Sequence, residues 1–315
     1  MKTNSIFDEW IYDHAQYTAV LDTLTEEIER ALSGSTPFVF PVLGDSRTGK
    51  TAMLRDIETR FSERVGPAGH CRVIRIEMPP LPSLEALAAE IIKKVMGPLT
   101  FKGKAYQVLN HAQEVMEAAG VCVLLVDEAN HLEEKLSTAR AQSKENRRAA
   151  DWYKVLLDRF GISLVIAGLA HVSRIYSDND QLENRGLVGA RIYPYAWSKP
   201  ADRVEYQNTL SAGMAHMKDN GWVIDVAPDL VTRVAYFGGG GYVGMARDFL
   251  VRIEKVGEAH KRLDAKLLER AYKDKYKFAL DAFSAPIPLK YIDDVMLNAA
   301  HQRALERAIR SGRGR

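Results

Sequence analysis

A short stretch near the start of the chain carries the residue types and spacing needed to hold phosphate groups. It reads Gly44, Asp45, Ser46, Arg47, Thr48, Gly49, Lys50 and Thr51, followed by Ala52. Glycines in such a loop let backbone N–H groups turn inward around phosphate, and the N-terminus of a following helix adds positive potential. The lysine of this pattern reaches the terminal phosphates, and its last hydroxyl binds Mg²⁺. We therefore expect residues 44–52 to bind ATP, with Thr51 as a metal ligand. A chance glycine-rich turn is the alternative.

A pair of carboxylates supplies the second half of this chemistry. The apolar run Val121–Val126 is followed directly by Asp127 and Glu128. A carboxylate at the C-terminal end of a buried strand can face a metal ion beside the phosphate loop. We expect Asp127 to bind Mg²⁺. Glu128 is expected to orient the attacking water or accept its proton, so it is a catalytic candidate, as is Lys50 at the phosphates. The alternative is that both carboxylates only cap a helix.

A parallel sheet with helices between its strands would bring the phosphate loop and the two carboxylates together. Apolar runs predict four buried strands, and helical periodicity with capping residues predicts helices around them. The strands are Phe38–Leu43, Cys71–Met78, Val121–Val126 and Ile162–Ala167, and the helices are Tyr17–Leu32, Ala52–Phe61, Leu84–Val95, Ala105–Ala119 and Trp152–Phe160. The segment from Glu134 to Arg148 is polar and basic, and it leads into the last of these helices.

The character of the chain changes after Trp197, where helical patterns replace strand patterns. They cover Ala201–Met217, Pro228–Tyr236, Val243–Glu258 and Ala265–Tyr276. The fold class is therefore α/β, with a parallel-sheet core followed by a smaller helical domain. We predict an N-terminal extension and helix at 1–35, the core at 36–197, the helical domain at 198–280 and a basic tail at 281–315.

Composition limits the class of protein without selecting a partner. Hydrophobic residues make up 46% of the chain, which is enough for a substantial core, and the formal net charge is only +2. Any basic surface must therefore be local. We find neither a signal peptide nor an apolar run long enough to span a membrane, so the expected location is cytoplasmic with no membrane partner.

Beyond these two motifs, the chain resembles AAA+ ATPases and, within them, the TniB/TnsC family of transposition regulators, to which the phage MuB ATPase is functionally related. The resemblance covers roughly residues 11–268. It rests on the order of several short motifs: Tyr12-Asp13-His14, Met78-Pro79, Pro82-Ser83, the run Asp127 to Leu132, Gly168-Leu169-Ala170, the run Asp180 to Arg185, and Leu187 to Trp197. It implies a three-layer P-loop AAA+ core and a helical lid.

The resemblance also implies roles for several polar residues. Arg185 corresponds to the arginine that an AAA+ subunit offers to its neighbour's nucleotide, with Arg191 as the competing candidate and a solvated arginine as the alternative for either. Arg247 corresponds to the lid residue that contacts phosphate, unless it pairs with Asp248 or Glu254 on its own helix. Many AAA+ proteins carry a polar sensor after the strand that corresponds to Ile162–Ala167. Here Gly168, Leu169 and Ala170 follow, which leaves His171 or Ser173.

Local clusters of basic residues are candidates for contact with a DNA backbone. They are Lys102, Lys104, Lys135, Arg140, Lys144, Arg147 and Arg148. Each cluster could be only a solvated face, but a ring of subunits would repeat every such residue along a duplex. The arginine-rich tail places Ala304, Leu305, Ala308 and Ile309 along one side of a short helix, which favours docking of a protein partner.

The resemblance implies an ATP-loaded homo-oligomer, a ring or filament on duplex DNA, that marks target sites and recruits or activates a transposase with target-selection proteins. An AAA+ loader or a defence or signalling ATPase acting on a protein partner is the main alternative. A small-molecule kinase is a third reading, which Glu128 beside Asp127 and a helical lid disfavour.

Overall fold

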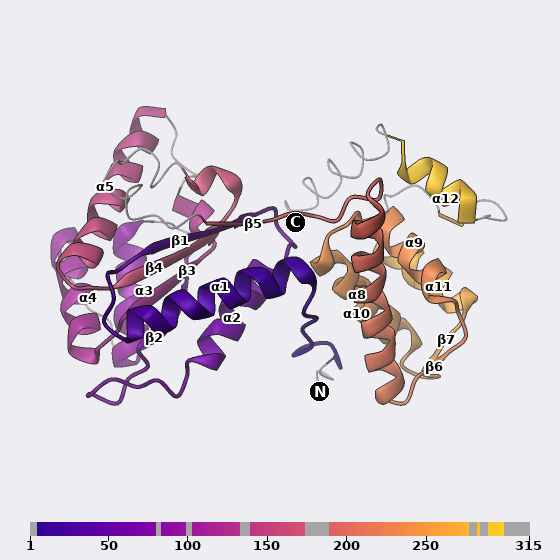
Figure 1. Cartoon of the computed structure of the whole chain (residues 1–315), viewed down its shortest axis with the longest axis horizontal. Helices are drawn as coiled ribbons and strands as arrows, with labels where there is room; N and C mark the ends of the chain where they lie inside the picture. The colour runs from indigo at the N-terminus through magenta and orange to yellow at the C-terminus, as the bar shows by residue number, and fades with distance from the viewer. Residues whose placement is uncertain are drawn as a thin grey trace. The chain divides into compact units, whose positions relative to one another are not determined.

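The structure is a computed structural model that describes residues 5–79, 83–98, 103–132, 139–173, 189–276, 282–283 and 289–298 (Figure 1). The chain divides into two compact units. One unit is Gln16–Ile192, and the other combines Met1–Ala15 with Tyr193–Arg315. The second unit is therefore built from two pieces of sequence that lie on either side of the first.

The first unit contains a five-stranded sheet in which all neighbouring strands are parallel. Its order is β2-β3-β4-β1-β5. The strands are β1 (Val39–Gly44), β2 (Val73–Glu77), β3 (Val123–Asp127), β4 (Ser163–Gly168) and β5 (Ala190–Ile192). Leu43 lies opposite Gly168, and Glu77 lies opposite Asp127. The C-terminal ends of these strands therefore meet at one edge of the sheet, which is where α/β folds place their ligands.

Helices cover both faces of this sheet and make a three-layer unit (Figure 1). The helices are α1 (Ala15–Leu32), α2 (Lys50–Arg60), α3 (Leu84–Met96), α4 (Ala105–Ala119) and α5 (Ala139–Asp158). Leu24 of α1 and Ile57 of α2 are buried in the cluster on one face. Leu87 of α3, Met116 of α4 and Leu156 of α5 are buried in the cluster on the other. The predicted α/β class with a parallel three-layer core is confirmed.

Local signals explain why several predicted boundaries agree with the structure. Ser83 caps α3 by accepting a hydrogen bond from the Ala86 N–H at 3.1 Å. Helix α4 ends at Gly120, whose φ of 72° is left-handed. The polar segment from Glu134 was not predicted to be helical, yet α5 already begins at Ala139. Tertiary packing of its apolar C-terminal half extends this helix into the charged segment.

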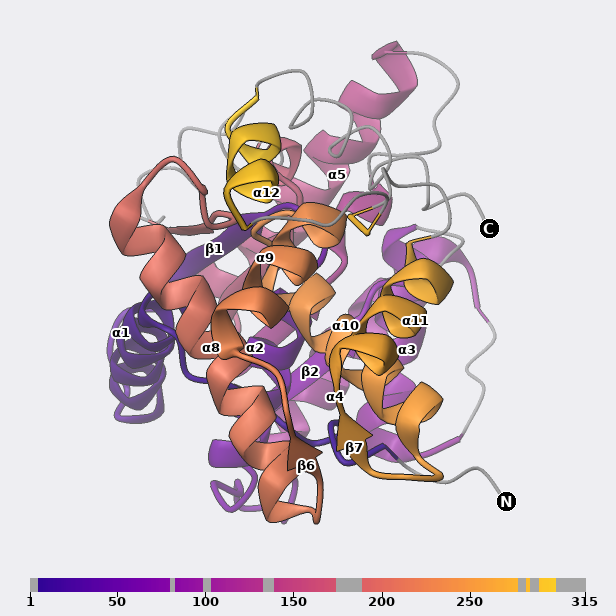
Figure 2. The same ribbon diagram turned by 90° about the vertical axis from the view of Figure 1, so that its right-hand side faces the viewer.

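The second unit is mainly helical (Figure 2). It contains α8 (Pro200–Asp219), α9 (Pro228–Gly239), α10 (Val243–Gly257), α11 (Ala265–Lys275) and α12 (Leu289–Met296). Helix α10 packs against α8, α9 and α11, and a short parallel pair joins β6 (Val223–Ile224) to β7 (Arg262–Leu263). In the parts of the chain that the structure describes, no helix combines the length and apolar character needed to cross a membrane.

The N-terminal segment packs into this helical unit. Phe7 is fully buried in its core. The Ile6 N–H donates to Glu254 Oε1 at 3.0 Å, and the Ile6 carbonyl lies 2.8 Å from Nε2 of His216. Sequence patterning gave no sign of this docking, because the contacts join residues more than 200 positions apart.

Candidate nucleotide site

The loop between β1 and α2 is shaped by close backbone packing. A Cβ atom at Gly44 would lie 2.6 Å from the Ile192 carbonyl oxygen and 2.9 Å from Thr48 Oγ1, so no side chain fits there. Thr48 closes the loop by donating its hydroxyl to the Asp45 carbonyl at 2.8 Å. Gly49 has a φ of 98°, which glycine adopts readily, and α2 begins at the next residue. The predicted strand, loop and helix are all present.

This loop presents backbone donors and a lysine together. In the described chain, the N–H groups of Ser46 and Gly49 have no hydrogen-bond acceptor. The Lys50 ammonium donates to the carbonyls of Gly44 and Asp45, each at 2.8 Å, and so lies against the loop. Open N–H groups, a helix N-terminus and a lysine are the donors that bind phosphate. Residues 44–51 therefore fit the phosphates of a nucleotide.

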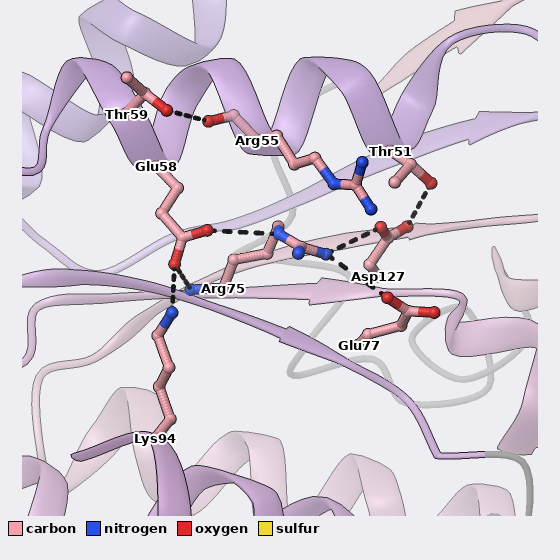
Figure 3. Close-up of polar contacts among 8 residues, drawn as sticks. All are labelled: Thr51, Arg55, Glu58, Thr59, Arg75, Glu77, Lys94 and Asp127. Atoms are coloured by element: carbon pink, nitrogen blue, oxygen red, sulfur yellow. Dashed lines mark hydrogen bonds and ion pairs between the residues drawn. The ribbon is translucent and has the colours of Figure 1, made fainter. Parts of the chain in front are cut away.

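Asp127 lies at the end of β3 beside the first turn of α2 (Figure 3). It is only 1% exposed. Its Oδ1 accepts hydrogen bonds from Thr51 Oγ1 at 3.3 Å and from the Glu128 N–H at 3.0 Å. Its Oδ2 accepts from Arg75 Nη1 at 3.3 Å. A carboxylate and a hydroxyl in contact are oxygen ligands of the kind that Mg²⁺ takes beside a nucleotide, so the predicted metal ligands Thr51 and Asp127 are brought together.

Burial and local charge act in opposite directions on Asp127. Burial raises the pKa of this carboxyl above its ordinary value, while the hydrogen bonds from Thr51 and Glu128 and the charge of Arg75 offset part of that rise. A divalent cation would favour the ionised carboxylate.

Glu128 has a strained backbone next to this carboxylate. Its φ is 52°, a left-handed conformation that is uncommon for a residue with a side chain. Its own N–H bonds to Asp127 Oδ1, which helps to hold that conformation. The side chain is half-buried. Backbone strain of this kind concentrates at functional sites, which agrees with the catalytic role predicted for Glu128.

The buried side-chain amide of Asn130 lies beside the end of β4. The sequence predicts the polar sensor in this region and offers His171 or Ser173 for it. A Cβ atom at Gly168 would lie 3.3 Å from Oδ1 of Asn130, which is only 5% exposed. Ser173 donates its hydroxyl to the Ala170 carbonyl at 2.9 Å, and both it and His171 lie in the short helix η2 (Ala170–Ser173). Asn130 belongs to the preceding helix η1 (Ala129–Leu132).

Of the two arginines predicted to contact a neighbour's nucleotide, the structure describes Arg191 but not Arg185. Arg185 lies outside the described residues. Arg191 lies in β5, opposite Leu43 and thus one residue from the start of the phosphate loop. Its side chain is exposed. The structure therefore places Arg191 near the phosphate loop of its own subunit.

Arg247 of α10 is engaged by the N-terminal segment. Its Nε donates to the Phe7 carbonyl at 3.0 Å, Nη2 also contacts that carbonyl, and Nη2 donates to the Asp8 carbonyl at 3.1 Å. Within the described part of the chain it pairs with neither Asp248 nor Glu254. Its predicted contact with phosphate stays a prediction.

The candidate DNA-binding residues are only partly described. Lys102 and Lys135 lie outside the described residues, as do the side chains of Arg140 and Lys144 in α5. Lys104 and Arg147 are exposed, whereas Arg148 donates to Glu85 Oε1 at 2.5 Å. Burial would raise the pKa of Glu85, but the hydrogen bond and charge of Arg148 outweigh it, so the pKa of Glu85 is lowered.

Two of the described basic residues have a known place beside α3 or α4. Glu85, which holds Arg148, is in the first turn of α3, and Lys104 precedes α4 shortly after α3 ends at Met96.

Two residues of the site were not found from the sequence. Arg75 is a charged residue inside the apolar strand β2, and this break in the pattern was the one available signal. Asn130 was noted only as part of the motif after Asp127. Its position beside Gly168 joins segments that are far apart in the sequence, so no local pattern predicts it.

Comparison with solved structures identifies the fold. The Aeropyrum pernix ORC1 protein in complex with DNA matches with a TM-score of 0.63 and 19% identity, over 84% of this chain and 66% of that one. This chain thus spans just under two thirds of ORC1. Cdc6p from Pyrobaculum aerophilum matches with a TM-score of 0.63 and 17% identity, over 90% of this chain and 74% of that one. The Aeropyrum pernix ORC2 protein in ADPNP–ADP complexes gives 0.59 and 18%, over 92% and 74%.

These similarities establish the α/β P-loop fold of AAA+ proteins. No curated protein sequence matches the chain. The family model described as "Bacterial TniB protein" matches residues 4–187, which is more than half of the chain. That span includes the phosphate loop, Asp127, Glu128 and Asn130. The chain therefore belongs to the TniB family of bacterial proteins.

Proposed function

We propose that this protein is an ATPase that binds Mg²⁺·ATP at the β1–α2 loop and hydrolyses it to ADP and phosphate. The observation that carries the proposal is the contact between Thr51 and the buried Asp127 at the mouth of a loop with open N–H groups. This arrangement pairs a phosphate cradle with oxygen ligands for a cation. Membership of the TniB family and the AAA+ fold support it.

Each side chain has a separate task in the proposed reaction. The loop N–H groups and Lys50 bind the phosphates, and Thr51 and Asp127 hold Mg²⁺, which neutralises charge on the phosphate oxygens. Glu128 orients the attacking water and accepts its proton. Asn130 of η1, which lies beside Gly168 at the end of β4, is the polar group that helps to position this water near the terminal phosphate.

Two substitutions test the assignment of binding and hydrolysis. Lys50→Ala removes the cation that faces the phosphates, so it should weaken ATP binding. Glu128→Gln keeps the size of the side chain but cannot accept a proton, so it should preserve binding and slow hydrolysis by about 100-fold or more. The measurements are titration with a fluorescent ATP analogue and steady-state phosphate release. Equal loss of ATP affinity in both variants would contradict these roles.

We further propose that ATP-bound subunits assemble on duplex DNA, where they regulate transposition by marking target sites and recruiting or activating a transposase. The TniB family match and the exposed Lys104 and Arg147 support this proposal. Electron microscopy of the Glu128→Gln variant with duplex DNA, ATP and Mg²⁺ should show rings or filaments. The absence of such assemblies, together with ATP-dependent capture of a protein partner, would instead favour a loader or signalling ATPase.

Assembly would also complete the catalytic site. We propose that Arg185 of one subunit neutralises charge at its neighbour's nucleotide, an effect worth ~10³–10⁵ in rate. Arg185→Ala should therefore leave ATP binding by isolated subunits intact and lower only the ATPase activity of the assembly. Arg191→Ala is the matched comparison, and a larger loss in that variant would move the role to Arg191.

A further inference from the structure

Arg75 contacts the carboxylate that is the candidate Mg²⁺ ligand, and it uses the oxygen that faces away from Thr51. Arg75 Nη1 lies 3.3 Å from Asp127 Oδ2, while Oδ1 accepts hydrogen bonds from Thr51 and from the Glu128 N–H. The Arg75 side chain is 16% exposed, and that of Asp127 is 1% exposed. The two oxygens of one buried carboxylate thus have different partners, as Figure 3 shows.

Arg75 is itself held by Glu58 of α2, the helix that follows the phosphate loop. Glu58 Oε2 lies 3.4 Å from Arg75 Nε, and Glu58 Oε1 accepts from the backbone N–H of Arg75 at 3.3 Å. Lys94 of α3 donates to the same carboxylate at 2.8 Å. Glu58 therefore fixes both the backbone and the guanidinium of Arg75.

The spacing along α2 explains why this network reaches the metal position. Thr51 and Glu58 are seven residues apart, close to two helical turns, so they lie on the same face of the helix. One end of this face contacts Asp127 directly through Thr51. The other contacts it through Glu58 and Arg75. Helix α2 thus holds Asp127 from both sides.

We propose that Arg75 is a positioning residue that holds Oδ2 of Asp127 and so keeps Oδ1 directed at Thr51 and Mg²⁺. This inference rests on the proposed function and adds to it a residue outside the two sequence motifs. Groups that bond to the ligands of a metal ion orient those ligands, and their loss commonly costs 10–100-fold in metal affinity. Arg75 occupies the oxygen opposite Thr51, so it supports cation binding rather than competing with it.

If Arg75 supports cation binding, its removal should lower the affinity for Mg²⁺. If it competed with the cation, its removal would raise that affinity. Arg75→Met keeps most of the length of the side chain and removes its charge and hydrogen bonds. Binding of a fluorescent ATP analogue would be titrated with Mg²⁺, and its affinity in EDTA would be measured separately. We expect the half-saturating Mg²⁺ concentration to rise by about 10-fold, with little change in EDTA.

Three further variants serve as controls. Arg75→Lys keeps the charge but cannot span Glu58 and Asp127 together, so it should recover part of the Mg²⁺ affinity. Glu58→Gln loosens Arg75 and should give a smaller rise in the Mg²⁺ requirement. Within the described residues, Lys94 has its printed contact with Glu58 and none with Arg75 or Asp127, so Lys94→Met should shift the requirement less than twofold. If Arg75→Met does not fold, the lysine and Glu58 variants decide the question.

An unchanged or lower Mg²⁺ requirement in the folded Arg75 and Glu58 variants would overturn the proposal. A fall in melting temperature without a shift in the Mg²⁺ titration would do the same, because it would assign Arg75 a structural role only. If the wild-type protein showed no Mg²⁺-dependent nucleotide binding, the proposed function would fail and this inference with it. That result is recognisable because it appears before any substitution is made.

Discussion

At the scale of single residues, Glu128 combines a proposed catalytic side chain with an unfavourable backbone. A left-handed conformation in a residue with a Cβ atom costs on the order of 1–3 kcal/mol. Glu128 has a φ of 52°, and its N–H is tied to Asp127. The fold therefore carries strain at the position where the proposed chemistry takes place.

Replacing Glu128 with glycine should separate stability from activity. Glu128→Gly relieves the backbone strain and should raise the free energy of unfolding of the first unit by about 1 kcal/mol, while ATP hydrolysis is lost. Lys261, with a φ of 45°, is the matched control outside the site. Lys261→Gly should relieve similar strain and leave hydrolysis unchanged. Chemical denaturation and phosphate release provide the two measurements, and a destabilised Glu128→Gly variant would contradict the strain argument.

Asn130 permits a second prediction at this scale. Its buried amide lies beside Gly168, whereas His171 and Ser173 lie in the next short helix. Asn130→Ala should lower the rate of hydrolysis by about 10-fold or more while ATP affinity changes little. His171→Ala and Ser173→Ala are the comparisons, measured by the same single-turnover assay. The polar role would pass to whichever of them gave the larger loss.

The predictable residues were those in contiguous motifs. The loop from Gly44 to Thr51 was predicted because phosphate binding requires glycine, lysine and hydroxyl residues at fixed spacing. Arg75 was not predicted, because its partner Asp127 is 52 positions away. Arg247 contacts Phe7, which is 240 positions away. Its partner therefore could not be predicted from the residues of its own helix.

At the scale of elements, a buried hydrogen bond joins two segments that flank the first unit. His14 Nδ1 lies 2.7 Å from the Tyr195 hydroxyl. His14 precedes α1, and Tyr195 follows β5. The bond therefore connects the end of the first sequence piece of the helical unit to the start of its second piece. His14 is 2% exposed.

This histidine should make the helical unit sensitive to acid. Burial lowers the pKa of His14 from 6.5 to about 4. The unfolded chain therefore binds a proton more readily, and stability falls as pH decreases from about 6.5 to 4. The expected loss is about 3 kcal/mol across this window.

Tryptophan fluorescence can follow this effect, because Trp10, Trp197 and Trp222 all belong to the helical unit. In His14→Gln, which cannot titrate, the dependence of unfolding free energy on pH should flatten between pH 4 and 6.5. Equal slopes in wild type and His14→Gln would refute the assignment.

Elements with strong local patterns were predicted well, and short ones were not. Helix α4 has the predicted bounds, because its apolar face and Gly120 mark both its course and its end. Strand β5 has only three residues and was missed. Its position beside β1 follows from pairing with a distant strand, which no local periodicity reveals.

At the scale of the whole molecule, DNA binding should depend strongly on salt. Each lysine or arginine that neutralises a phosphate releases counterions, so an assembly with 6–10 such contacts should lose about 10³–10⁵ in affinity between roughly 50 and 200 mM salt. Charge reversal of Lys102 and Lys104 to Glu should flatten this dependence and weaken binding to all duplexes alike. The measurement is fluorescence anisotropy with a random-sequence duplex and ATP at both salt concentrations.

Truncation after Ala300 is the matched comparison, because it removes the arginine-rich tail. We expect it to change DNA binding less, since the tail is predicted to dock a protein partner. If the truncation abolished binding while the Lys102 and Lys104 variant bound like wild type, the DNA contact would belong to the tail.

The division of the helical unit into two sequence pieces has a consequence for the timing of synthesis. The Phe7 carbonyl is bonded to Arg247, which is added 240 residues later. At translation rates of about 5–20 residues per second, Phe7 is synthesised roughly 10 to 50 seconds before that partner. During this interval the first unit can fold, while an apolar segment ahead of it stays unburied. A nascent chain stalled near residue 192 should therefore offer a chaperone its first ten residues, and release of the full chain should withdraw them.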